Sequence, residues 1–71
     1  MSSLGTEMPI AIKRAQRVRD QFIEMRGMPN VMVEPQIAMM AMEIDQAVAA
    51  MASGDVITML RAYEAIKDYQ P

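Results

Sequence analysis

The chain has 71 residues and a formal net charge of −2, and it contains neither cysteine nor histidine. Its length allows one domain, and its composition excludes disulfides, thiolate metal sites and histidine-based catalysis. Ten methionines supply flexible apolar side chains that fill cores or adapt to binding partners. Residues 1–30 carry five basic and three acidic side chains, whereas residues 31–71 carry two basic and six acidic. We therefore expect a single domain over residues 1–71 whose two halves have opposite charge.

The first predicted element is a helix over about residues 8–26. Residues 1–5 are small and polar and are expected to be disordered. Thr6 is the expected N-cap, which places Pro9 in the first turn, where a missing N–H costs nothing. Apolar residues then recur at alternating steps of three and four, which is typical of a buried helical stripe: Met8, Ala11, Ile12, Ala15, Val18, Phe22 and Met25.

The first helix is expected to end at Gly27, because glycine readily adopts the left-handed conformation that stops a helix. Phe22 is the only phenylalanine and is expected to be buried where this helix crosses the next. Residues 31–33 are two valines around a methionine, which predicts an extended segment against the core. Pro35 is well suited to open the following helix.

The second predicted helix runs over about residues 35–52 and has the most apolar sequence in the chain. One stripe follows the helical period: Ile37, Met40, Ala41, Ile44, Val48 and Met51. Met39 and Met42 lie outside this stripe, so the helix is apolar nearly all round. Such a helix is normally buried on more than one side. Either the two flanking helices cover both methionines, or the methionines form a surface that binds another protein.

The third predicted helix covers about residues 56–69 and folds back along the second. Gly54 is expected to end the second helix with a positive φ, and Asp55 to cap the third. A connection this short makes the two helices antiparallel neighbours. The predicted fold is an all-α, three-helix domain in which one face of the third helix is buried: Val56, Met59, Leu60, Tyr63 and Ile66.

A basic group on the first helix is the second candidate binding site. Lys13 and Arg17 are four residues apart and repel each other on one face, with Arg14 beside them, unless an anionic partner lies there. Phosphates are one such partner. However, the pI of about 4.9 argues against nucleic acid, because nucleic-acid-binding domains are usually basic. The alternative is a cluster that faces solvent or another subunit.

The sequence contains no pattern that indicates catalysis. Glu43 and Asp45 are two residues apart and point away from each other on a helix, and without histidine no Glu-x-x-His metal motif exists. We expect no enzymatic activity, no cofactor and no metal. No apolar run approaches the ~20 residues of a membrane span. The N-terminus lacks the pattern of a signal peptide, so a cytoplasmic protein is expected.

Three short patterns lie in the first half of the chain: Thr6-Glu7-Met8, Phe22-x-Glu24 and Met28-Pro29. Together they resemble the theta subunit of bacterial DNA polymerase III, in which similar patterns begin and end a long first helix. The segment after Met28-Pro29 departs from that family, because it is rich in methionine and alanine instead of charged and aromatic residues. The resemblance implies a small non-catalytic subunit that binds and stabilises a proofreading exonuclease.

The sequence therefore predicts a small non-catalytic interaction protein that binds a larger protein or a second copy through Met39 and Met42. Such a protein would be a modulator or an accessory subunit, of the kind that phages and plasmids encode. The two rivals are a theta-like accessory subunit and a nucleic-acid-binding protein that uses the basic face. The charge asymmetry predicts an antiparallel pairing that brings Arg14 or Arg17 near acidic residues such as Glu43 or Asp68.

Overall fold

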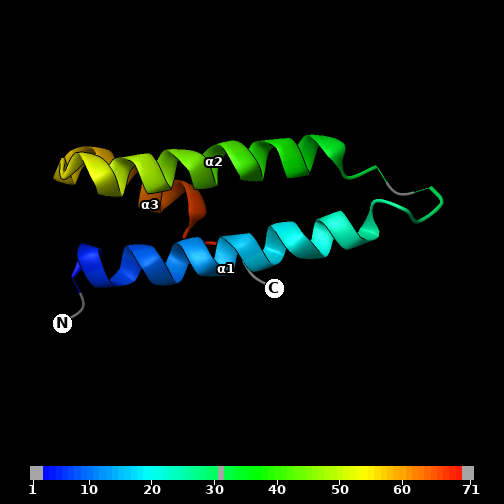
Figure 1. The fold of residues 1–71 in the computed structure, drawn as a ribbon, viewed down its shortest axis with the longest axis horizontal. Helices are drawn as coiled ribbons and strands as arrows, with labels where there is room; N and C mark the ends of the chain where they lie inside the picture. The colour runs from blue at the N-terminus through cyan, green and yellow to red at the C-terminus, as the bar shows by residue number, and fades with distance from the viewer. Residues whose placement is uncertain (1–2, 31, 70–71) are drawn as a thin grey trace.

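The computed structural model describes residues 3–30 and 32–69, which form three α-helices and no strand. They are α1 (Leu4–Met25), α2 (Glu34–Ser53) and α3 (Val56–Ile66). Figure 1 shows α1 and α2 side by side as a long antiparallel hairpin, with α3 folded back behind one half of it. The molecule measures 43 × 21 × 15 Å. The predicted all-α, three-helix architecture is confirmed.

The helix α1 begins four residues earlier than the sequence pattern predicted. Ser3 is the N-cap, and its hydroxyl accepts a hydrogen bond of 3.3 Å from the Thr6 amide. The prediction of Thr6 as the cap was therefore wrong: residues 4 and 5 belong to the helix, and Ser3 satisfies one of the free amides of its first turn. Residues 1–2 lie outside the described part. Pro9 is inside α1, beyond the first turn, so it removes one backbone hydrogen bond there.

The end of α1 also differs from the prediction. The helix stops at Met25 with Arg26 as a right-handed cap, and Gly27 has no positive φ. The left-handed residue of the connection is Asn30, with φ 65°, because asparagine tolerates this conformation better than other side chains. Val33 is buried against the hairpin, as expected, whereas Met32 is exposed. Val31 lies outside the described residues.

The turn between α2 and α3 matches the sequence prediction. Gly54 has φ 71° and ends α2. The Asp55 carboxylate then accepts hydrogen bonds from the Ile57 amide (3.3 Å) and from the Thr58 hydroxyl (2.5 Å). The first of these bonds satisfies one of the free amides at the start of α3, so the reversal is held by a glycine and one acidic cap.

The core lies at the end of the hairpin that α3 covers. Met8 and Ile66 are fully buried there, and alanines from α1 and α2 let α3 approach closely. The cluster consists of Met8, Ala11, Ile12, Ala15, Ile44, Ala47 and Ile66. Because α3 packs against the alanines of α2, the buried stripe of that helix is centred nearer Ala47 than predicted.

Some of the predicted core residues lie outside this cluster and are exposed or only partly buried, Met25 (38% exposed) among them. Val48, Val56 and Leu60 are 51%, 67% and 49% exposed. Val48 turns away from α3, and the other two lie on the far side of α3, which buries a narrower face than expected. Phe22 is only partly buried, because α3 ends before it reaches this position.

The positive φ of Gly54 predicts a graded response to substitution. Gly54→Val should destabilise the fold by roughly 1–2 kcal/mol or more, because a β-branched residue is strained in the left-handed region. Gly54→Asn should be mild. A Cβ at this site meets no atom within 4 Å, so the difference measures backbone strain alone. Urea unfolding followed by circular dichroism tests it, and equal losses for the two variants would contradict this origin.

The position of the core predicts a second stability contrast. Met8→Ala removes a fully buried side chain and should cost about 2–5 kcal/mol. Phe22→Ala should cost less, about 1–2 kcal/mol, because part of the ring already contacts water. Comparing the two urea midpoints checks the ranking, which a more damaging Phe22→Ala would reverse.

Candidate protein-binding surface

The helix α3 is too short to cover the hairpin. It has 11 residues, against 22 in α1 and 20 in α2. At 1.5 Å per residue it spans about 16 Å, whereas each helix of the hairpin spans about 30 Å or more. The half of the hairpin next to the loop between α1 and α2 therefore lacks a third helix (Figure 1).

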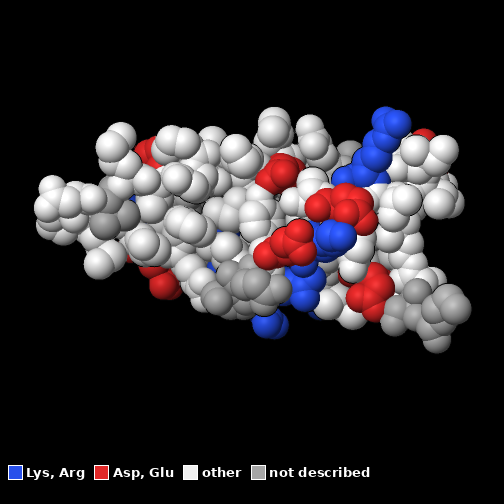
Figure 2. All heavy atoms as spheres, turned by 180° about the vertical axis from the view of Figure 1, so that it is seen from behind, with Lys and Arg blue, Asp and Glu red and all other residues white. Residues whose placement is uncertain are grey.

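A groove lies where the third helix is missing. It encloses about 290 Å³ and is lined by residues of α1, α2 and the segment after α3, namely Val18, Phe22, Gln36, Met39, Met40, Asp68 and Tyr69. We call it the open groove. Figure 2 shows the molecule from the α3 side: charged side chains gather over the half that carries α3, and the half toward the loop is mainly uncharged. The open groove is therefore a largely apolar surface.

Met39 and Met42 are exposed, as one of the two sequence interpretations required. Their exposed fractions are 57% and 53%, so the flanking helices do not cover them. Met39 lines the open groove, and Met42, three residues further along, is turned toward the outer side of α2. The exposed apolar surface thus extends from the groove around the edge of α2.

Tyr69, which sequence reasoning did not single out, is one of the residues that line the open groove. Its hydroxyl donates a hydrogen bond to the Glu43 carboxylate on α2. Burial of the ring, and then this hydrogen bond, raise the pKa of Tyr69 to about 12. Tyr69 lies beyond the end of α3, where no helical period applies, so an aromatic residue near the chain end was the only available signal.

The three basic residues predicted as a binding group on α1 do not all have the same surroundings. Lys13 and Arg17 are exposed and, with Ile10 and Arg14, line a shallow hollow of about 360 Å³. Arg14 instead donates a hydrogen bond of 3.2 Å to the Lys67 carbonyl at the end of α3. Arg14 therefore links two helices, while Lys13 and Arg17 have no acidic partner within 4 Å among the described residues.

The charges that were expected to pair two molecules are partly used within one chain. Glu43 accepts from Tyr69, and Arg14 donates to a backbone carbonyl. An association that depends on Arg14 meeting Glu43 would have to break both contacts. Two of the four residues named for the antiparallel charge pairing, Arg14 and Glu43, therefore already have partners within the chain.

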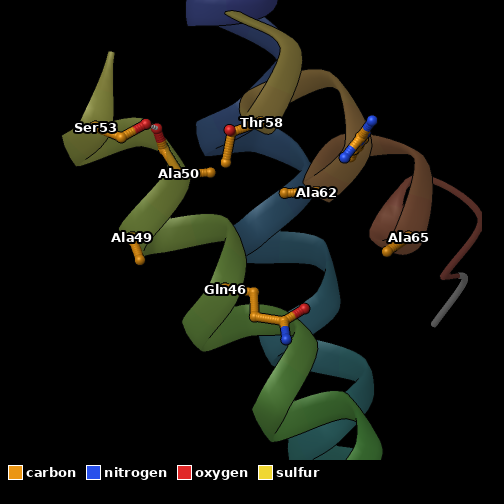
Figure 3. A pocket seen from close by; sticks show the side chains of 8 residues that line it. Gln46, Ala49, Ala50, Ser53, Thr58, Ala62 and Ala65 are labelled. Atoms are coloured by element: carbon orange, nitrogen blue, oxygen red, sulfur yellow. Dashed lines mark hydrogen bonds between the residues drawn. The ribbon is translucent and has the colours of Figure 1, made fainter. Parts of the chain in front are cut away.

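Another pocket, of about 520 Å³, lies between α2 and α3, and four of its eight lining residues are alanines (Figure 3). Its two hydroxyls belong to the turn: Ser53 donates to the Ala50 carbonyl (2.6 Å), and Thr58 donates to Asp55. Within residues 3–30 and 32–69 no group of acidic side chains could hold a metal ion. Nor does any described helix combine the length and apolarity needed to cross a membrane.

No protein-family model, no curated protein and no solved structure matches this chain. The resemblance to the theta subunit therefore stays a prediction from three short patterns.

The Tyr69–Glu43 contact predicts a loss of stability at high pH. A pKa raised from 10.0 to about 12 means that folding favours the neutral phenol. Its contribution is complete below pH 10 and is lost as the pH rises from about 10 to 12. Thermal melting of the wild type should therefore fall more steeply across this interval than that of Tyr69→Phe, which has no phenolic proton. Parallel melting curves for the two proteins would contradict the contact.

Proposed function

We propose that this protein is a non-catalytic interaction protein that binds another protein chain through the open groove and the adjoining methionines of α2. The observation that carries the proposal is the missing third helix over half of the hairpin. In helical domains such a position is normally filled by another helix, because two packed helices leave an apolar face between them. A partner that offers an amphipathic helix fits this surface.

The total exposed area supports the same conclusion. The chain exposes 4957 Å², whereas a compact monomer of 7.9 kDa is expected to expose about 4,400 Å². A stable interface buries around 800 Å² per partner. Apolar area removed from water contributes about 25 cal/mol per Å² before the costs of association are subtracted. The excess surface is thus comparable to a substantial part of an interface.

Methionine suits this role because its unbranched side chain adapts to the shape of a partner. Met39 at the groove and Met42 on the outer side would contact different parts of a bound helix. We assign the protein the role of a modulator or accessory subunit in the cytoplasm. A theta-like subunit that binds a proofreading exonuclease is one form of this role, and the three short patterns of the first half are its support.

A nucleic-acid role would instead use Lys13 and Arg17 on α1. The two functions differ in their response to salt. Binding to phosphates weakens steeply as salt rises, because counterions are released, whereas docking on an apolar groove does not. Binding measured at low and high salt therefore separates them.

The proposal predicts that Met39→Glu combined with Met42→Glu abolishes binding and leaves the helices intact. Both side chains are more than half exposed, so the monomer should keep its circular dichroism spectrum and melting point. Sedimentation equilibrium detects self-association, and capture from a cell extract detects other partners. Val48→Glu is the matched control, since it places a charge on the opposite edge of α2 and should bind normally.

Two results would overturn this function. If the double variant binds like the wild type, the interface lies elsewhere. If the wild type neither associates with itself nor captures a protein that the double variant loses, the apolar surface has no binding role.

A further inference from the structure

Beside its charged residues, the outward side of α3 carries apolar residues that the monomer does not bury. Val56, Ile57 and Leu60 are 67%, 63% and 49% exposed, although the inner side of the same helix is packed on the core through Ile66. An 11-residue helix with apolar residues on both sides is suited to contact two neighbours. One neighbour is its own hairpin, and the other is absent from the monomer.

The part of the hairpin that α3 leaves uncovered is similar in length to α3. The hairpin is about 30 Å long and α3 covers about 16 Å of it, so the uncovered part is close to the length of one further α3. In Figure 1, α3 lies behind one half of the layer formed by α1 and α2, and no helix lies behind the other half.

We propose that the occupant of the open groove is α3 of a second copy of this chain, in a twofold dimer in which each copy fills the open groove of the other. This inference rests on the proposed function and names its partner. The two copies lie back to back, related by an axis across the middle of the hairpin. The two α3 helices then lie end to end between the two hairpins, and each is covered on both sides.

In this dimer a single type of contact covers both the open groove and the exposed apolar residues of α3. Because a twofold interface is formed by the same surface on both molecules, every contact occurs twice. The outward residues of each α3 meet the groove of the other copy, so both unpartnered apolar surfaces are removed from water.

The register follows from the helical rise. The helix α3 starts at the end of the hairpin away from the connecting loop, so α3 of the second copy starts at the loop end. Leu60 of the second copy then lies at the level of Phe22 and Gln36, and Ile57 one turn nearer the loop. These residues line or adjoin the apolar part of the open groove.

Charge favours the same occupant. Among the described residues that line the open groove, Asp68 carries a charge. The exposed side of α3 carries Arg61 and Glu64. Glu64 is paired with Lys67 (2.8 Å), whereas Arg61 has no acidic partner within 4 Å among the residues that the structure describes. A second α3 therefore brings a cation to a groove whose lining supplies an anion.

Cysteine cross-linking tests the arrangement, because the chain has no cysteine of its own. Leu60→Cys and Gln36→Cys are prepared separately as full-length chains and then mixed under mild oxidation. The dimer predicts a disulfide between the two variants. It predicts little between identical variants, since each position lies about 20 Å along the hairpin from its twofold mate. Ala38→Cys is the control for Gln36→Cys, because it is exposed on α2 but faces away from the groove.

Light scattering on the wild type should give the mass of a dimer, and Leu60→Glu should give a monomer of unchanged helix content. A monomeric wild type, or disulfides that form between identical variants instead of the mixed pair, would overturn the twofold arrangement. The proposed function has a separate fate: it survives if a monomeric wild type captures another protein that the Met39→Glu, Met42→Glu variant loses. If the wild type is monomeric and captures nothing, both proposals fail.

Discussion

The close packing of α3 on one half of the hairpin determines the rest of the structure. Alanines at 11, 15 and 47 remove bulk from the facing sides of α1 and α2, so that Ile66 reaches a position without solvent contact beside Met8. Where α3 stops, the residues on the same faces become larger. Their side chains fill part of the space between α1 and α2, and the remainder is the open groove. One short helix thus produces both the core and the exposed apolar surface.

Local patterns were sufficient to predict the helices. The helical period located all three helices. Gly54 followed by Asp55 identified the turn, because glycine commonly ends a helix and aspartate commonly caps the next one. The start of α1 was missed because Ser3 and Thr6 are both good caps, and only the structure shows which hydroxyl accepts. The stripe of α2 was misplaced toward Val48, because a large side chain gives a stronger pattern than Ala47. Ala47 is buried instead because its small side chain lets α3 pack closely against α2.

The candidate site was predictable only in part, for a related reason. Met39 and Met42 were identified because α2 is apolar on more sides than two neighbours can cover, and that inference needs no tertiary detail. The groove beside them depends on the length of α3 relative to α1 and on the position of Tyr69 after α3 ends. The hydrophobic periodicity of the sequence predicts neither the relative length of α3 nor the position of Tyr69. The apolar residues Val56 and Leu60 were assigned to the core for the same reason: the sequence shows that α3 is amphipathic but not how narrow its buried face is.

The division of the molecule into a covered and an open half also links binding to stability. The covered half contains the buried cluster, whereas the loop half is held mainly by the contact between α1 and α2 and by a few side chains such as Val18 and Val33. Regions with fewer buried apolar contacts open at lower free energy than the core. A partner that binds only the closed form stabilises it by mass action. Occupying the open groove would therefore stabilise most strongly the half that the chain's own core supports least.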